Sequence, residues 1–158
     1  MDKNLLTYLK KYNINYKIHE HPPVFTVSQS IKLKLQINCL HTKNLFLKDE
    51  KGRFYLVCMA AYKRLNIKKL EEHLKVKKLK FSSSEELKKE LNLPPGSVSI
   101  FGMIYAKNTH LLMDKEVYSA SSSGFHPNIN TATLEIDRVS LEKFYNSLSC
   151  SKEVINIG

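Results

Sequence analysis

The chain has 158 residues, of which 42% are hydrophobic and 25% are charged, close to the averages of soluble globular proteins. This length predicts that residues 1–158 form one domain with a hydrophobic core. No apolar run approaches the roughly 20 residues of a membrane span. The first residues, MDKNLLTYLKKY, interrupt their apolar positions with lysine and so do not resemble a secretory signal. We therefore expect a cytoplasmic protein with no membrane partner.

The charge balance is strongly basic. The net charge is +10, and only three of the 25 basic residues are arginine. Lysine favours attraction to phosphate over bidentate reading of bases. This balance indicates either a polyanionic partner, most simply a nucleic acid, or a general lysine bias that the many asparagines would share. Charge alone does not decide between the two.

The cysteines do not predict a metal site. Cys39, Cys58 and Cys150 are odd in number and widely spaced, without CxxC or Cys/His zinc spacing. We expect three reduced thiols and no metal.

The first quarter of the chain predicts two helices and a short strand. Apolar residues share one face over residues 4–12, and Asp2 can cap that helix. The alternating run INYKIHE predicts a strand, and HPPVFT an extended loop, because a proline disfavours helix in the residue before it. A second short helix is expected over residues 28–35.

The clearest element is a β-hairpin. In NLFLKDEKGRFYLVCMA, two apolar runs flank the turn DEKG, where Gly52 can adopt positive φ. A helix capped by Asn66 follows, and then a short strand KLKFS. Ser83 and Glu86 have the spacing of a capping box at the start of the next helix.

The last third predicts three strands and a helix. Strands are expected in SIFGMIYA, HLLMD and NTATLEI, and Ser140 is expected to cap the final helix. Strands and helices interleave without a strict βαβ repeat. The fold class predicted is therefore α+β, with a single mixed, largely antiparallel, twisted sheet.

Three polar segments lie at the ends of predicted strands: HTKNLF, PPGSVS and GFHPNINTAT. Strand ends that meet at one rim of a sheet can form a pocket. Each segment also has a purely structural interpretation. Lys43 could bind phosphate or polarise a carbonyl, or be a solvated lysine. Gly96 and Ser97 could present backbone N–H groups to a ligand, or form a tight turn. His126 could move a proton, or satisfy local carbonyls in a turn.

Asn128, Asn130 and Thr131 fit either interpretation. No Ser-His-Asp, Cys-His or paired-carboxylate arrangement appears in the sequence.

Four separated segments, EHPPVFTV, HTKNLFLKD, PGSVSIF and GFHPNINTATLEI, together resemble the YbaK/ProX family of aminoacyl-tRNA deacylases. This family shares the editing domain of bacterial prolyl-tRNA synthetases. The resemblance runs from about Leu5 to Tyr145. HTKNLFLKD and FHPNINTAT are most similar to the ProX branch, which clears alanine wrongly attached to proline tRNA. The cysteine-clearing YbaK branch lacks that pairing.

The resemblance implies a barrel-like mixed sheet with flanking helices. It implies hydrolysis of mischarged Ala-tRNA(Pro), with aminoacylated tRNA(Pro) as partner and no cofactor or metal. Prolyl-tRNA synthetase is a further implied partner, either in trans or with this chain as a domain fused in cis. Two alternatives remain: a non-catalytic tRNA-binding or regulatory module on the same fold, and a deacylase for another small amino acid such as cysteine.

The resemblance also implies the site residues. Lys43 would hold the aminoacyl-adenosine end, the backbone from Gly96 to Ile100 would bind the amino acid carbonyl, and His126 would lie in the pocket. The remaining contacts expected with substrate are Asn44, Ser97, Val98, Ser99, Ile100, Gly124, Phe125 and Asn130. Ile100 departs from the family loop, which usually ends in proline, so the rigidity of the loop and the amino acid preference depend on this position.

Overall fold

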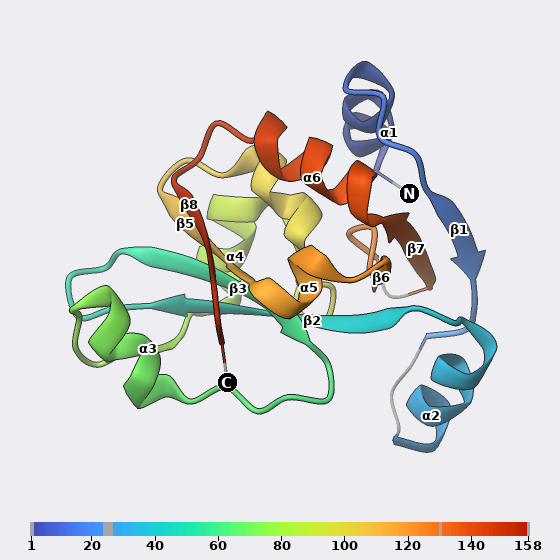
Figure 1. Cartoon of the computed structure of the whole chain (residues 1–158). Coiled ribbons are helices and arrows are strands. Elements are labelled where there is room, and N and C mark those ends of the chain that lie inside the picture. The colour runs from blue at the N-terminus through green and yellow to red at the C-terminus, as the bar shows by residue number, and fades with distance from the viewer. Residues whose placement is uncertain (1, 24–26, 130, 158) are drawn as a thin grey trace.

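The computed structural model describes residues 2–23, 27–129 and 131–157. Its strands form one mixed sheet of eight strands in the order β1-β7-β6-β2-β3-β5-β8, with β4 paired to β2 (Figure 1). Among the described residues four strand pairings are antiparallel and three are parallel. The predicted α+β class and mixed sheet are therefore confirmed.

The strands are β1 (Lys17–Glu20), β2 (Leu40–Lys48), β3 (Phe54–Ala60), β4 (Lys80–Phe81), β5 (Thr109–Asp114), β6 (Ser122–Phe125), β7 (Ala132–Asp137) and β8 (Lys152–Ile155). The helices are α1 (Lys3–Lys11), α2 (Val27–Gln36), α3 (Ile67–Leu74), α4 (Ser84–Leu91), the 3₁₀ helix η1 (Ile100–Tyr105), α5 (Lys115–Ser119) and α6 (Arg138–Ser147). In the described part of the chain, none of these helices is long and apolar enough to cross a membrane.

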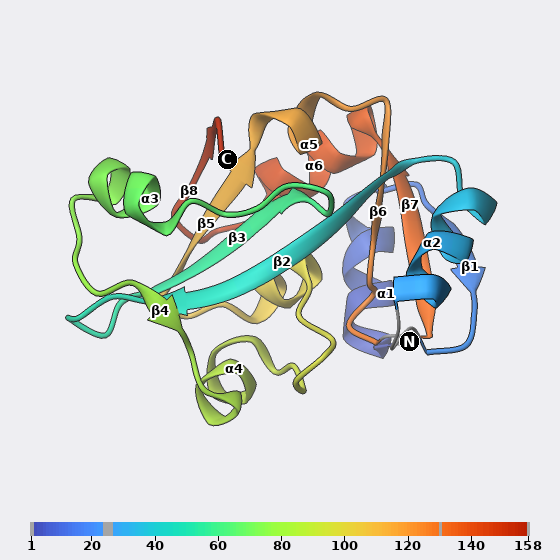
Figure 2. The ribbon, with the colours of Figure 1, turned by 90° about the horizontal axis from the view of Figure 1, so that it is seen from below.

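Strand β2 is the longest strand and connects the two parts of the sheet (Figure 2). Its first residues pair in parallel with β6, where Leu40 lies opposite Ser123 and His41 opposite Gly124. From Thr42 onward β2 pairs antiparallel with β3, forming the predicted hairpin. Gly52 in the hairpin turn has a φ of +78°. The polar segment HTKNLF therefore lies where β2 changes partner.

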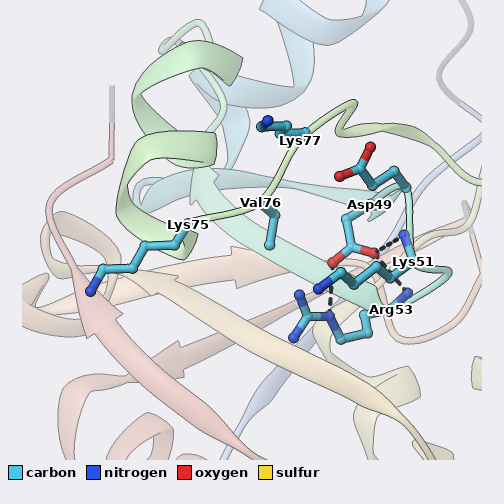
Figure 3. Close-up of a pocket in the computed structure, with 7 residues that line it drawn as sticks. Asp49, Lys51, Arg53, Lys75, Val76 and Lys77 are labelled. Atoms are coloured by element: carbon cyan, nitrogen blue, oxygen red, sulfur yellow. Dashed lines mark hydrogen bonds and ion pairs between the residues drawn. The ribbon is translucent and has the colours of Figure 1, made fainter.

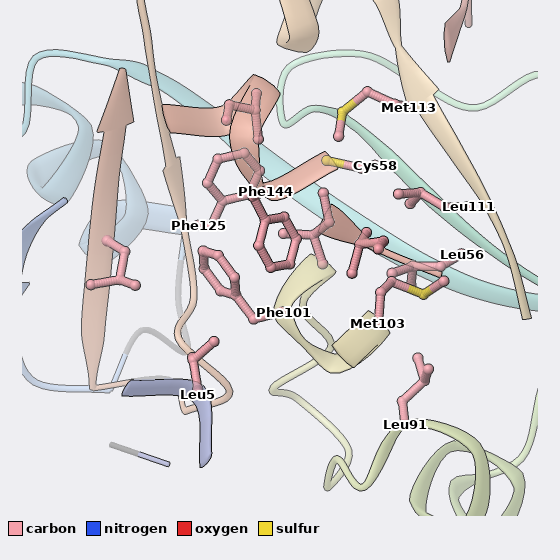
Figure 4. Close-up of a cluster of buried hydrophobic side chains, with 14 of the residues drawn as sticks. Leu5, Leu56, Cys58, Leu91, Phe101, Met103, Leu111, Met113, Phe125 and Phe144 are labelled. Atoms are coloured by element: carbon pink, nitrogen blue, oxygen red, sulfur yellow. The ribbon is translucent and has the colours of Figure 1, made fainter. Parts of the chain in front are cut away.

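The core has two parts, on opposite faces of β2. Successive side chains of a strand point to opposite faces. Phe46 packs into the larger cluster, which includes Phe101, Phe125 and Phe144 (Figure 4). Leu45 and Leu47 instead pack in a second cluster beneath α3. Lys43 therefore shares a face with the second cluster, and Asn44 shares a face with the first.

The predicted helix starts are mostly confirmed. The side chain of Asp2 accepts from the backbone N–H groups at the start of α1. Asn66 caps α3, and Ser83 and Glu86 form a complete capping box on α4. Ser140 does not cap the last helix, because α6 begins earlier: Asp137 is its N-cap and accepts from the N–H of Ser140 at 2.8 Å.

The strand predicted in SIFGMIYA is wrong. Residues Ile100–Tyr105 form the 3₁₀ helix η1, which starts where the Ser99 hydroxyl accepts from the N–H of Phe101 at 3.1 Å. A 3₁₀ turn can bury apolar side chains on one side, and Ile100 and Phe101 are both fully buried. Alternation over a short apolar run did not distinguish this turn from a buried strand.

Candidate functional site

The segment at the start of β2 is held against β6 by a side-chain hydrogen bond. The hydroxyl of Thr42 donates to the carbonyl of Gly124 at 2.7 Å. A Cβ atom at Gly124 would lie 2.9 Å from the Cys39 sulfur and 3.0 Å from a methyl group of Thr133. Gly124 therefore allows β6 to approach its neighbours closely. This packing brings two of the predicted segments side by side.

Lys43 is partly buried and its ammonium donates to the backbone carbonyl of Lys63, in the connection between β3 and α3. Lys63 is itself held firmly. Its Nζ lies 2.9 Å from a carboxylate oxygen of Asp114 and 3.0 Å from one of Glu116. The hydrogen bond from Lys63 to Asp114 is the main cause that raises the pKa of the lysine. The carboxylate of Asp114 is only 1% exposed. Its ion pair with Lys63 therefore fixes the loop that contains the Lys63 carbonyl, to which the ammonium of Lys43 donates.

The turn PPGSVS is closed by the N–H of Ser97, which donates to the carbonyl of Pro94 at 3.3 Å. Gly96 has a φ of +82°, and a Cβ atom there would meet nothing within 4 Å among the described residues. Val98 is partly buried against the larger core cluster. Ser99 is fully buried and its hydroxyl donates to the carbonyl of His126. This bond joins the turn to the third predicted segment.

His126 follows β6 and is mostly buried. Burial is the main cause that lowers the pKa of its imidazole, and the nearby rings of His21 and His41 lower it further, against a hydrogen bond with the backbone of Ala132. A lowered pKa keeps the ring neutral at pH 7. Its Nδ1 is buried and has no hydrogen-bond partner among the described residues.

Two further polar atoms of the predicted segments are buried without a hydrogen-bond partner among the described residues. They are Oδ1 of Asn44 and Oδ1 of Asn128. Asn128 has a left-handed φ of 63°, and its Nδ2 donates to Asp2 at 3.4 Å. Buried polar atoms in native proteins nearly always have partners, so such exceptions need an explanation. A bound ligand with both donors and acceptors would satisfy them. Asn130, also predicted here, lies outside the described residues.

Sequence reasoning missed His21 and His41, although both lie in the segments that carried the resemblance. The Nε2 of His21 is 2.9 Å from the Thr133 hydroxyl, and the Nε2 of His41 is 3.0 Å from the carbonyl of Ile37. In the part of the chain that is described, no group of three or more His, Cys, Asp or Glu side chains is arranged to hold a metal ion. His21 and His41 lie near enough to His126 to lower the pKa of its imidazole, and we call these three residues the histidine wall.

Two cavities open beside His21. One of about 280 Å³ lies under α2, and one of about 440 Å³ lies along β1 and the start of β7. His21 is common to both. The residues lining the first are His21, Pro22, Pro23, Gln29, Lys32, Leu33 and Gln36. Those lining the second are Ile18, Glu20, His21, Ile129, Thr131 and Ala132. Cavities of this size next to a histidine wall can accept a small ligand.

Most of the sequence matches a known family. The model of the aminoacyl-tRNA editing domain matches residues 21–144, which include the polar segments that begin β2, form the PPGSVS turn and follow β6. The chain belongs to this editing-domain family.

Relatives with curated descriptions support this assignment. The editing domain is 36% identical to the prolyl-tRNA editing protein ProX of Acetoanaerobium sticklandii over 138 residues, which cover 85% of this chain and 84% of that protein. It is 30% identical to the prolyl-tRNA synthetase associated domain-containing protein 1 of Danio rerio over 146 residues, covering 90% of this chain and 79% of that protein.

Solved structures share the fold of the editing domain. A hypothetical protein superposes with a TM-score of 0.78 at 19% identity, covering 98% of this chain and 99% of that one. A candidate trans-editing enzyme for prolyl tRNA synthetase superposes with a TM-score of 0.74 at 15% identity, covering 99% and 98% of the two chains. At these identities the likeness establishes the fold alone.

Proposed function

We propose that this protein hydrolyses the ester bond that links alanine to mischarged tRNA(Pro). Membership of the editing-domain family and 36% identity to a prolyl-tRNA editing protein support this substrate class. The protein would act on aminoacyl-tRNA(Pro) beside prolyl-tRNA synthetase, in trans or as a domain of that enzyme. Residues 1–158 would form one editing domain.

The observation that carries the proposal is a set of three buried polar atoms, of Asn44, His126 and Asn128, that have no hydrogen-bond partner among the described residues. Leaving one such atom buried without a partner costs about 1–3 kcal/mol. An aminoacyl-adenosine end carries hydroxyls, an ammonium and carbonyl oxygens, which supply both donors and acceptors. The hydroxyl and ammonium groups of that end are donors that could pair with the two amide oxygens and with Nδ1 of His126.

The chemistry needs positioning more than a nucleophilic side chain. A water oxygen attacks the ester carbonyl carbon, the bond from that carbon to the ribose oxygen breaks, and the ribose oxygen takes the proton. The neighbouring ribose hydroxyl can orient the water. Backbone N–H groups from Gly96 to Ile100 would stabilise the developing negative charge on the carbonyl oxygen. Lys43 would hold the adenosine end, and a neutral His126 can accept or donate a hydrogen bond.

Selection against proline would rest on shape. One methylene in an apolar pocket discriminates by only about 1–3 kcal/mol, so cognate proline has to be excluded by steric clash. The turn ending at Ile100 and the wall at His126 would provide that clash. The Ile100 side chain is fully buried in the larger core cluster. Burial of the Ile100 side chain can restrict the backbone at this end of the turn, as a proline would by fixing φ.

The test is a deacylation panel with Ala-, Cys-, Ser- and Pro-tRNA(Pro) measured side by side. The proposal expects multiple turnovers on Ala-tRNA(Pro) and little release of proline. Faster release of cysteine would reassign the protein to another small amino acid. Salt-sensitive tRNA binding with no release of any amino acid would instead support the non-catalytic module that a net charge of +10 also suits.

A further inference from the structure

A basic surface lies at the far end of the β2–β3 hairpin from Lys43. Two turns meet there: the hairpin turn, residues 49–53, and the connection between α3 and β4, residues 75–79. The N–H of Glu50 donates to the carbonyl of Lys77 at 3.1 Å, which ties the turns together. Between them is a cavity of about 210 Å³ (Figure 3). It is lined by Asp49, Glu50, Lys51, Arg53, Lys75, Val76 and Lys77. We call this the hairpin-tip surface.

Asp49 lies beneath this surface, where its carboxylate holds the hairpin turn and offsets one positive charge through its ion pair with Arg53. Its side chain is fully buried. It accepts from the backbone N–H groups of Lys51 and Arg53 at 2.8 and 3.0 Å, and from the hydroxyl of Tyr55 at 2.8 Å. Burial alone would raise the pKa of Asp49, but these hydrogen bonds lower it, so the carboxylate stays charged while it holds the turn.

The charges that face solvent are mostly positive. Arg53 donates its Nε to Asp49 at 3.0 Å, while its side chain is 58% exposed and its two terminal amino groups point away from that carboxylate (Figure 3). Glu50 is the only exposed acid among the described residues of the two turns and β4. The exposed basic residues of the same segments are Lys51, Arg53, Lys75, Lys77, Lys78 and Lys80.

The backbone adds an independent observation. Lys75 and Lys78 have left-handed φ values of 57° and 55°. Lys75 is the C-cap of α3 and Lys78 lies in the connection to β4. Glycine or asparagine is the usual residue in this conformation, because a Cβ atom there costs about 1 kcal/mol. Lysine at both positions keeps two positive charges on the surface at a local cost in stability. Two lysines with left-handed φ in one short connection favour a binding role for their positive charges.

Lys43 and the hairpin-tip surface lie toward opposite ends of β2, since the hairpin turn directly follows Lys48. A strand rises about 3.3 Å per residue, so Lys43 and Asp49 are about 20 Å apart along the chain direction of β2. A nucleic acid carries a negative charge at every nucleotide. One whose 3′ end is held at Lys43 would therefore have phosphates within reach of the hairpin tip.

We propose that the hairpin-tip surface binds the sugar–phosphate backbone of the RNA whose aminoacylated 3′ end enters the site. This rests on the proposed function for the identity of the RNA. Lysine-rich composition suits phosphate contacts that position the RNA without reading its sequence. The surface would therefore contribute affinity for the body of the RNA, and the site would contribute selection of the amino acid.

The test compares two triple variants with equal net charge. Lys51→Gln/Lys75→Gln/Lys77→Gln alters the hairpin tip. Lys3→Gln/Lys10→Gln/Lys11→Gln alters exposed lysines on α1, which lies at the other end of the molecule from α3 (Figure 1). Binding of uncharged tRNA is measured at several salt concentrations. Loss of three phosphate contacts should weaken binding roughly tenfold or more and reduce the slope of log K against log salt by about 2–3. The α1 variant should stay close to wild type.

A second measurement separates this proposal from the proposed function. The hairpin-tip variant should hydrolyse a short aminoacylated 3′-terminal oligonucleotide at the wild-type rate, but full-length mischarged tRNA with a raised KM. Thermal melting shows whether each variant is folded. If no aminoacyl ester is hydrolysed, the binding comparison still decides this proposal. Equal weakening by both triple variants, or binding of the surface to anionic phosphatidylserine vesicles but not to tRNA, would overturn it.

Discussion

The hydroxyl of Ser99 donates to the backbone carbonyl of His126, across 27 residues of sequence. The same hydroxyl accepts from the N–H of Phe101, so one fully buried side chain starts η1 and fixes the segment after β6. Ser99 therefore joins two parts of the predicted site. One is the turn from Gly96 to Ile100, expected to bind the substrate carbonyl, and the other is His126, expected to line the pocket.

Ser99→Ala should disrupt both elements. It leaves a carbonyl and an N–H without their partner, which costs about 1–3 kcal/mol of unfolding free energy. We expect deacylation to fall more than stability alone explains, because the turn and the histidine lose their relative position. Urea unfolding and steady-state kinetics measure the two effects. Ser140→Ala serves as the control, because it also removes a buried hydroxyl, which accepts from the N–H of Asn15 at 3.1 Å, but outside the predicted site. An equal loss of deacylation in the two variants would contradict the role of the Ser99 bond.

Lys43→Ala should reduce deacylation by more than about tenfold, equivalent to about 1.4 kcal/mol of transition-state stabilisation. Stability should change little, because Lys43 is only partly buried. Lys48→Ala is the matched control on the same strand, since Lys48 faces the other side and pairs with Glu86 at 2.8 Å. Near-normal activity in folded Lys43→Ala protein would reject the proposed role of this lysine.

The loop that receives Lys43 depends on the Lys63–Asp114 pair, whose Nζ and carboxylate oxygen are 2.9 Å apart. Lys63→Met would leave the buried carboxylate unpaired, which typically costs about 3–5 kcal/mol. We expect lower stability together with a raised KM, because the carbonyl that anchors Lys43 would move. An unchanged KM in the fraction that remains folded would show that the loop does not position the lysine.

Acid should destabilise the protein through His126. Burial lowers the pKa of His126 below its usual value of 6.5. Between that value and the lower folded pKa, the unfolded chain binds more protons than the native one, so stability is complete above about pH 6.5 and falls as pH decreases. Comparing urea unfolding at pH 7.5 and 5.0 checks this, and His126→Asn should flatten the change. A slope identical to that of wild type would assign the acid sensitivity to other groups.

Ile100→Pro should restore the stiffness of the family loop and sharpen selectivity for alanine over serine and proline. It also removes part of a fully buried side chain, so we expect a loss of about 2–4 kcal/mol. Ile100→Val removes one methylene without restricting φ and separates the two effects. An unchanged ratio of alanine to serine release in Ile100→Pro would mean that burial already fixes the turn.

Local patterns predicted the elements whose physics is local. The hairpin at Gly52, the caps at Asp2 and Asn66, and the capping box at Ser83 follow from side chains within a few residues of each other. The parallel pairing of β2 with β6 could not be read from the sequence, because no short-range signal links residues more than 80 positions apart.

The same limit applies to the site. Its segments were recognisable from four matching stretches of sequence, but the anchoring of Lys43 by the Lys63 carbonyl is a contact between a side chain and a distant backbone atom. Neither the composition of the chain nor the periodicity of its apolar residues predicts such a contact. The histidine wall was overlooked for a related reason: His21 and His41 come near His126 only after the four strands β1, β7, β6 and β2 have paired.

The change of partner at Thr42 makes the site unequally tolerant of length variation. Residues added at the hairpin turn, beyond Lys48, would leave the pairing of β2 with both neighbours intact. A single residue inserted between Cys39 and Thr42 would instead shift the β2–β6 ladder against the β2–β3 ladder, so that Leu40 and His41 would exchange faces relative to Lys43 and Asn44. In homologous proteins, insertions should therefore accumulate in the hairpin turn between β2 and β3, and be absent from residues 39–42, where β2 begins.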